Sequence, residues 1–330
     1  MALLQDNKAQ VNVDLIRLSG TIINAGSKSF AAAAKLFDPQ TRANAYLLYA
    51  WCRHCDDVID GQELGHNLKS TSNHNPRAAL DALRQQTADA LNGKPMAEPV
   101  FAAFQLVMQR NEIPPHHAYE LLDGFKMDVE ARHYETLEDT LSYCYHVAGV
   151  VGVMMAYVMG ARKPAVLDRA SDLGLAFQLT NIARDVVADA QVGRIYVPES
   201  WLREAGIPRD EIADPKHRAA LASVIARLLA VAEKYYKSSR VGLSDLHLRS
   251  AWAVATARNV YRRIGEKVQI RGARAWDSRV STSKVRKLHA ACRGAGIALY
   301  THSPLHLTLL QPRDGLWTRP REATHQAGAR

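Results

Sequence analysis

The segment YAWCRHCDDVID, residues 49–60, has three aspartates among its last five residues and otherwise resembles part of an apolar helix. Asp38 can cap a helix whose first turn holds Pro39 and whose apolar pattern continues to Gly61. The aspartates then occupy the last turn, near the negative end of the helix dipole, where they lower the stability of the helix. Acids that destabilise a helix end, with no compensating feature in the sequence, indicate a functional position.

The acidic end of this predicted helix forms a polar stripe. At 100° per residue, Tyr49, Arg53, Asp56 and Asp60 fall within about 60° of one another, whereas Asp57 points away. Taken alone, a DDxxD helix end is more typical of a solvated surface than of a binding site. The interpretation therefore depends on whether the chain contains a partner for this stripe.

A second stripe occurs in DLGLAFQLTNIARDVVADA, residues 172–190. Gln178, Asn181, Asp185 and Asp189 lie within about 80° of one another on a helix whose other faces are mostly apolar. Unpaired carboxylates in a core are very costly, so this stripe must line a wet cavity or bind a ligand.

Two helices that each present carboxylates at i and i+4 can face each other across a cavity. Their oxygens are hard ligands suited to Mg²⁺ or Mn²⁺. Because Mg²⁺ usually joins one or two carboxylates to substrate phosphates, the paired stripes predict a diphosphate between them. Basic residues accompany these motifs, as a diphosphate site requires. Arg53 lies one turn before Asp56, Arg184 adjoins Asp185, and Lys28 lies in GSKSF.

The rest of the chain predicts an all-α fold. Apolar residues recur at spacings of three and four, and the breaks in this pattern separate roughly ten helices. The 330 residues are 47% hydrophobic and 23% charged, which is ordinary for a soluble globular protein. Without a linker or a repeat, we expect one helical domain over residues 1–302. Residues 303–330 gain proline and lose periodicity, which predicts a flexible C-terminal tail.

Several features bear on location. The four cysteines are too few and too scattered for a disulfide framework, which favours a reducing compartment. The N-terminus lacks the pattern of a secretory signal, so we expect a cytoplasmic protein. The uncharged stretch Leu141–Ala161 approaches the length of a bilayer span, but its polar first third predicts a buried core helix. The net charge of +9 suits a solvated surface, nucleic acid, anionic lipid or an anionic substrate.

The competing motifs are weaker. Cys52 and Cys55 form a CxxC inside a helix with no second pair at zinc spacing, which is typical of core cysteines. GSKSF, residues 26–30, lacks the spacing of a P-loop, and no GxGxxG is present. The basic residues do not alternate with aromatic ones, so we expect no nucleic-acid binding.

Longer runs of sequence carry a resemblance to a known family. DDVID at residues 56–60 and NIARDVVADAQVGRIYVP at 181–198 are similar to the squalene and phytoene synthases, which join two prenyl diphosphates head to head. The runs GSKSFAAAAKLFD, LYAWCRHCDDVID, YCYHVAGVVGVMMA, LGLAFQLTNIARD and RSAWAVATARNVYRRIG share this resemblance over residues 20–300. One departure is Ala188, where relatives often carry an acid, but Asp185 and Asp189 keep the required spacing.

The resemblance implies an isoprenoid synthase fold, in which helices surround a central apolar cavity and two facing aspartate motifs hold metal ions and diphosphates. It implies that the metal ligands are Asp56, Asp60, Asp185 and Asp189. It also implies contacts to substrate, with Tyr49 and Arg53 in the catalytic group, and with Ser27, Lys28, Tyr143, Val147, Gln178, Asn181, Arg184, Tyr261 and Arg279 in the substrate-binding group.

The activity implied is condensation of two geranylgeranyl diphosphates through a cyclopropyl diphosphate to a hydrocarbon with a central double bond. The expected cofactor is Mg²⁺ or Mn²⁺, without NADPH. The alternatives are a squalene or dehydrosqualene synthase that uses farnesyl diphosphate, and a helical protein that binds lipid diphosphate without catalysis. The excess of basic residues predicts peripheral association with the inner face of the cytoplasmic membrane. The sequence makes no prediction of oligomeric state.

Overall fold

A computed structural model of the chain describes residues 2–62, 75–280, 284–303 and 312–320. The described residues form thirteen α-helices joined by short turns, and none of them lies in a β-strand, so the all-α prediction is confirmed. The α-helices are α1 Ala2–Gly26, α2 Lys28–Ala34, α3 Pro39–Asp60, α4 Pro76–Leu91, α5 Pro99–Asn111, α6 His116–Val129, α7 Leu137–Cys144, α8 Val150–Val158, α9 Pro164–Gln191, α10 Glu199–Glu204, α11 Arg218–Val241, α12 Leu248–Arg271 and α13 Lys284–Thr301.

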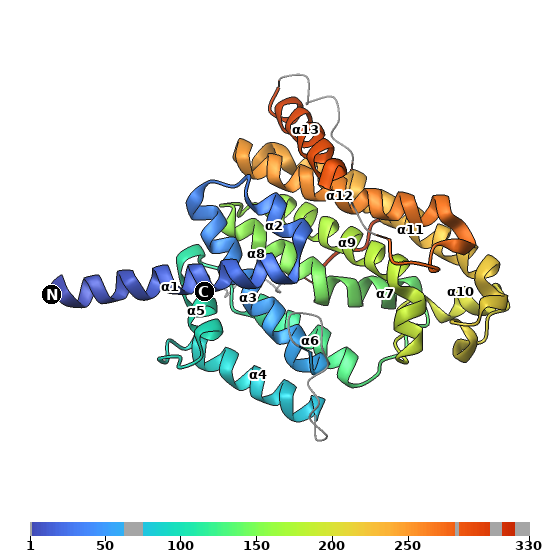
Figure 1. Cartoon of the computed structure of the whole chain (residues 1–330), viewed down its shortest axis with the longest axis horizontal. Helices are drawn as coiled ribbons and strands as arrows, with labels where there is room; N and C mark the ends of the chain where they lie inside the picture. The colour runs from blue at the N-terminus through green and yellow to red at the C-terminus, as the bar shows by residue number, and fades with distance from the viewer. Residues whose placement is uncertain (1, 63–74, 281–283, 304–311, 321–330) are drawn as a thin grey trace, which may run out of the picture.

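Helix α9 is the longest helix and lies at the centre of the fold, in contact with α8, α11 and α12 (Figure 1). Helix α3 packs against α1 and α5 on the other side of the core, and α1 extends away from the body toward its N-terminus. The fold therefore places the two helices with acidic stripes, α3 and α9, in one helical body.

The ends of α3 agree with the sequence prediction. Asp38 is the N-cap, and its carboxylate accepts hydrogen bonds from the backbone N–H groups of Gln40 and Thr41, both at 3.0 Å. Gly61 ends the helix with φ of +63°, a left-handed conformation that glycine adopts without strain. Trp51 is fully buried and stacks on Phe104 with ring centroids 4.1 Å apart, which anchors the apolar face of α3.

Residues 137–158 form one apolar helical run that is long enough, by length and composition, to cross a membrane. It consists of α7, a π-helical turn at Tyr145–Gly149 and α8, and 56% of its most apolar window is buried inside the protein. A Cβ atom at Gly174 would lie 2.3 Å from the carbonyl oxygen of Ala148, and one at Gly152 would lie 2.4 Å from that of Ala170. The run therefore packs backbone to backbone on α9 as a core helix.

Part of the C-terminal region predicted as a tail, residues 312–320, lies against the body of the protein. Arg313 donates two hydrogen bonds to Asp172, at 2.9 and 2.8 Å, and Arg319 donates one to Asp168 at 2.9 Å. Both aspartates are buried on α9, so two basic side chains of this segment neutralise charge inside the protein. Loss of helical periodicity in the sequence does not exclude docking by ion pairs of this kind. Residues 304–311 and 321–330 lie outside the described residues.

Candidate active site

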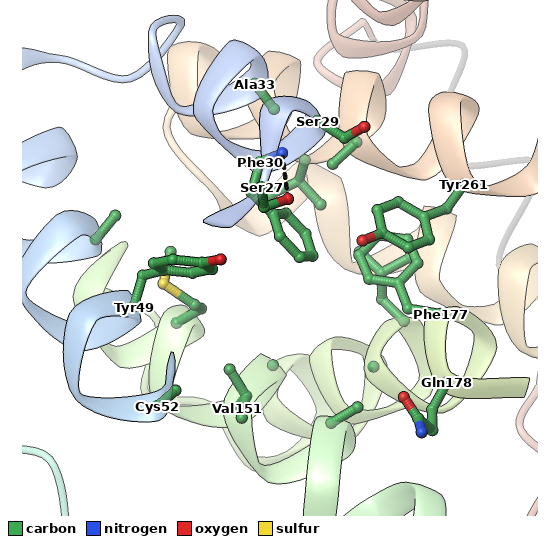
Figure 2. A pocket seen from close by; sticks show the side chains of 18 of the residues that line it. Ser27, Ser29, Phe30, Ala33, Tyr49, Cys52, Val151, Phe177, Gln178 and Tyr261 are labelled. Atoms are coloured by element: carbon green, nitrogen blue, oxygen red, sulfur yellow. Dashed lines mark hydrogen bonds between the residues drawn. The ribbon is translucent and has the colours of Figure 1, made fainter. Parts of the chain in front are cut away.

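A cavity of about 980 Å³ lies between α2, α3, the run 137–158, α9 and α12. Figure 2 shows Tyr49, Phe30 and Tyr261 pointing into the same space from three different helices. The Tyr261 ring stacks on Phe177 at 4.3 Å and on Phe30 at 5.3 Å, so an aromatic cluster forms one wall. Such a wall offers a long apolar ligand contact and leaves little room for water.

The first acidic stripe faces this cavity from α3. Tyr49, Arg53 and Asp56 all belong to its wall. The Arg53 guanidinium lies 3.0 Å from a carboxylate oxygen of Asp56 and 2.9 Å from one of Asp57. Asp57, which the helical angle places off the stripe, therefore helps to hold Arg53. Burial and the neighbouring Asp60 carboxylate raise the pKa of Asp56 to about 7.

The second stripe faces the same cavity from α9. Gln178, Asn181 and Arg184 belong to the wall, and the Asn181 amide donates a hydrogen bond of 3.3 Å to the Gln178 side chain. Arg184 donates to both carboxylate oxygens of Asp185, at 2.8 and 2.5 Å. Burial and the Asp185 carboxylate raise the pKa of Asp189 to about 7.

Arg194 connects the two stripes. Its guanidinium donates a hydrogen bond of 2.5 Å to Asp60 on α3, and its charge also acts to lower the pKa of Asp189 on α9. Asp60, Asp185 and Asp189 are not part of the cavity wall itself. Asp185 follows the wall residue Arg184, whereas Asp60 lies four residues after Asp56 and Asp189 five residues after Arg184. The structure thus brings the ends of the stripes together around one arginine.

The remaining predicted site residues also reach the cavity. Ser27 caps α2, accepting a hydrogen bond of 3.3 Å from the Phe30 backbone N–H, and Lys28 follows it in the cavity wall. Arg279 lies in the wall, with its Nε atom 4.0 Å from a carboxylate oxygen of Asp185. The other members of this group are Tyr143, Val147 and Tyr261, all of which are wall residues.

Two functional residues were missed by sequence reasoning. Asp128 lies in the cavity wall and accepts hydrogen bonds from the hydroxyls of Tyr143 and Tyr196, at 3.2 and 2.9 Å. The two phenol rings stack with centroids 4.5 Å apart. Burial raises the pKa of Asp128 to about 6, against the hydrogen bond from Tyr196. Tyr196 occurs in the conspicuous run GRIYVP, but nothing near Asp128 in the sequence indicates this contact.

Val147 was predicted, but its backbone setting was not. It lies within the π-helical turn Tyr145–Gly149, which follows directly after α7, the helix that ends at Cys144 and carries Tyr143. Such turns occur frequently at functional sites, because the extra residue changes the direction in which neighbouring side chains point.

The aspartates have the chemistry of a divalent-cation site, but among the described residues no three of their ligand atoms lie within 4.8 Å of one another. Carboxylates at i and i+4 on two helices form an all-oxygen donor set, and such sets suit hard cations. The pKa values of Asp56 and Asp189 are raised to about 7 by burial and by like charge, even though Arg53, Arg184 and Arg194 are close. Burial favours the neutral form of these two carboxyls, and a bound divalent cation would favour the charged form and lower both pKa values.

Comparison with known proteins places these features in a family context. Residues 23–286 match the family described as squalene/phytoene synthase. The chain is 50% identical over 310 residues to a 15-cis-phytoene synthase of Pantoea ananas, covering 94% of this chain and 99% of that protein. It is 52% identical over 299 residues to a 15-cis-phytoene synthase of Enterobacter agglomerans, covering 90% of this chain and all of that protein.

Solved structures show the same architecture. A dehydrosqualene synthase in complex with a ligand superposes with a TM-score of 0.78 at 28% identity, covering 87% of this chain and 97% of the other. A squalene synthase from Alicyclobacillus acidocaldarius superposes with a TM-score of 0.69 at 23% identity, covering 79% and 96% of the two chains. The second likeness concerns the fold alone, and both confirm the predicted isoprenoid synthase architecture.

Proposed function

The chain belongs to the squalene/phytoene synthase family, and we propose that it is a prenyltransferase that joins two geranylgeranyl diphosphates head to head to form phytoene, the first committed step of carotenoid formation. The observation that carries this proposal is the pair of acidic stripes at one side of a long apolar cavity, with Arg53, Arg184 and Arg194 among them. The names of the relatives that are about half identical to this chain support the choice of product.

Members of this family depend on a divalent metal, and we propose Mg²⁺, or Mn²⁺, for this chain. Asp56, Asp60, Asp185 and Asp189 would hold it. When bound, the metal neutralises the charge of the departing diphosphate. Around this site, Arg53 and Lys28 bind and orient the diphosphate, and Ser27 adds a hydroxyl donor at the start of α2.

The reaction follows from what the cavity wall can do. The C–O bond of the first substrate breaks, the diphosphate leaves with the electron pair, and the double bond of the second substrate attacks the allylic cation. Loss of a proton gives a cyclopropyl diphosphate. A second ionisation, rearrangement and proton loss then give a hydrocarbon with a central double bond, with release of the second diphosphate.

The wall around the reacting atoms must exclude water and accept protons. Phe30, Phe177 and Tyr261 present ring faces to a cation and keep water from quenching it. The hydroxyls of Tyr143 and Tyr196 are held by Asp128, which keeps both phenols in place beside the cavity. Since the final cation loses a proton instead of gaining a hydride, the balance requires no reductant, and we propose that no NADPH is used.

The depth of the cavity supports a long substrate. On α9 its wall extends from Arg184 to Val166, which is 18 residues or about 27 Å at 1.5 Å per residue. An extended geranylgeranyl chain of about 16 main-chain carbons spans roughly 18 Å at the rise per bond of an extended chain, and a farnesyl chain of about 12 spans roughly 13 Å. The longer chain therefore fits within the depth available.

The dehydrosqualene synthase fold match favours one alternative within the family, which is condensation of farnesyl diphosphate. One experiment distinguishes the two functions. Purified protein is incubated with Mg²⁺ and either geranylgeranyl or farnesyl diphosphate, with and without NADPH, and the hydrocarbon is identified by mass spectrometry. We expect phytoene from the longer substrate, no effect of NADPH and no product after chelation. Exclusive use of farnesyl diphosphate would assign the protein to the alternative, and tight binding without any product would assign it as a lipid-diphosphate-binding protein.

For location we propose the cytoplasm, with peripheral association at the inner face of the cytoplasmic membrane. The net charge of +9 and the hydrocarbon product support this assignment. High salt is expected to release the protein from membranes by screening this attraction. Retention in the membrane fraction after both high salt and alkaline carbonate would contradict it.

A further inference from the structure

The segment 312–320 is fixed on α9 by Arg313 and Arg319, whose carboxylate partners lie one helical turn apart. Trp317 lies between these two arginines in the sequence. Its backbone N–H group donates a hydrogen bond of 3.1 Å to the Tyr235 hydroxyl, and its carbonyl oxygen accepts one of 3.1 Å from Arg313. Directional contacts therefore set the position of Trp317 relative to α9.

The Trp317 side chain packs on Tyr145. The two ring centroids lie 5.5 Å apart with an angle of 44° between the ring planes, a separation at which aromatic rings attract each other. Tyr145 is fully buried, and its hydroxyl donates a hydrogen bond of 2.8 Å to Glu120 on α6. The Tyr145 ring is thus held between the C-terminal segment and α6.

Tyr145 is the first residue of the π-helical turn that divides α7 from α8. Val147 and Ala148 of this turn belong to the cavity wall. The turn has little free space around it, because a Cβ atom added to Gly149 would lie 2.6 Å from the Leu175 side chain on α9 and 2.9 Å from the Tyr145 ring. A shift of the Tyr145 ring would therefore move the turn and, with it, part of the cavity wall.

A simpler interpretation is that Trp317 only covers apolar surface. The ion pairs on either side of it argue against this interpretation, because the side chains of Arg313 and Arg319 are only 16% and 9% exposed and their partners are almost fully buried. Buried ion pairs often stabilise a fold no better than apolar packing of the same volume, but they require one geometry. Such pairs suit a segment that must hold one position.

We propose that Trp317 is a positioning residue for the reaction, and that it holds Tyr145 so that the π-helical turn keeps Val147 in the cavity wall. The inference rests on the proposed function. The cyclopropyl diphosphate must ionise and rearrange before water reaches the cation, and this step depends on a closed wall. Loss of the indole lets the turn move, so water adds to the cation and gives an alcohol and a proton in place of the hydrocarbon.

The test compares products, since the ratio of two products of one enzyme does not depend on the fraction of protein that is folded. The parent protein and Trp317→Ala are incubated with Mg²⁺ and labelled geranylgeranyl diphosphate. Hydrocarbon, cyclopropyl diphosphate and alcohols that contain both prenyl chains are then separated by chromatography. We expect the ratio of the last two to hydrocarbon to rise about tenfold in Trp317→Ala, with KM within about twofold of the parent value.

Two further substitutions at Trp317 separate the ring from its volume. Trp317→Phe keeps a ring against Tyr145, and its product ratio should lie within about twofold of that of the parent protein. Trp317→Leu keeps apolar volume without a ring, and it should shift the ratio in the same direction as alanine. The leucine variant carries the test if the alanine variant does not fold.

The matched control is Trp252→Ala. Trp252 is also half-buried, and its indole N–H donates a hydrogen bond of 2.8 Å to the carbonyl oxygen of Ala291 on α13, but it is not part of the cavity wall. This variant should lose stability and keep the product ratio of the parent protein.

A second measurement needs no turnover. Amide hydrogen exchange of the π-helical turn is followed by mass spectrometry in the full chain, with α5 as an internal reference. We expect exchange in the turn to be about tenfold faster in Trp317→Ala than in the parent protein, and exchange in α5 to be unchanged. An unchanged product ratio in Trp317→Ala, an equal change in Trp252→Ala, or unchanged exchange in the turn would overturn the proposal. Absence of any condensation product from the parent protein would instead contradict the proposed function.

Discussion

Replacing Arg313 by alanine is predicted to destabilise the whole fold, although Arg313 lies in a segment of irregular structure. Its guanidinium donates to both oxygens of Asp172, whose side chain is only 1% exposed, and lies 3.7 Å from Asp168. The substitution leaves the Asp172 charge buried, with the Ser238 hydroxyl as its remaining hydrogen-bond donor among the described residues and the Arg169 charge still acting to lower its pKa.

The magnitude follows from the loss of one partner in a buried ion pair, which typically costs about 3 to 5 kcal/mol. We expect about 3 kcal/mol, the lower end of that range, because the Arg313 side chain is 16% exposed and water can partly replace it. The free energy of unfolding would be measured by urea denaturation, followed by the helical circular dichroism signal.

The pH dependence of this effect has a definite sign. Burial raises the pKa of Asp172 above its ordinary value, and Arg313 acts to lower it, so removing Arg313 raises that pKa further. A group with a raised pKa in the folded state contributes stability below its unfolded pKa and loses that contribution as pH rises through the folded pKa. The difference in the free energy of unfolding between Arg313→Ala and the parent protein is therefore expected to shrink as pH falls toward about 4.

The matched control is Arg203→Ala, since Arg203 makes a comparable two-bond contact to Glu135 with both side chains more than half exposed. Exposed pairs of this kind contribute little to stability. Adding Asp172→Asn to the Arg313→Ala variant should restore part of the lost stability by removing the buried charge that has lost Arg313. The reasoning is refuted if Arg313→Ala costs no more than Arg203→Ala, or if the added Asp172→Asn makes no difference.

The remaining predictions concern the cavity. Asp60→Asn and Asp189→Asn are each expected to lower kcat about a hundredfold or more while the unfolding transition stays unchanged. These carboxylates act through their charge and contribute little to packing. Near-normal turnover in both variants would contradict the model of two facing stripes. Asp128→Asn keeps a hydrogen-bond acceptor but removes its charge, so kcat for product formation should fall about tenfold with KM nearly unchanged; equal changes in the two constants would indicate a role in binding instead. Val166→Trp fills the far end of the cavity, so the ratio of kcat/KM for geranylgeranyl over farnesyl diphosphate should drop about tenfold, and an unchanged ratio would place the ends of the prenyl chains elsewhere. Chelation of divalent cations should stop turnover, and Mg²⁺ or Mn²⁺ should restore it; activity that persists in excess chelator would contradict the assigned ligands.

Local features of this protein could be predicted from the sequence because they depend on neighbours within a few residues. Asp38 and Gly61 bound α3 through backbone contacts two to five positions away. The stripes on α3 and α9 follow from the fixed angle between successive residues of a helix, which needs no tertiary information. Proline and glycine breaks likewise separate most of the helices. The prediction of roughly ten helices falls short of the thirteen described α-helices, and the π-helical turn that divides α7 from α8, which has no marker in the sequence, accounts for one of them.

Contacts between distant residues could be decided only by the tertiary structure. Asp128 meets Tyr196, 68 positions away, Arg194 meets Asp60 across 134, and Arg313 meets Asp172 across 141. No periodicity links such pairs, because each forms only when several helices have packed. The same holds for α13, where the sequence shows a stripe of leucines but not its direction. Close packing of Gly294 on Thr256 turns the small face inward, and that contact leaves Leu288 and Leu299 in solvent.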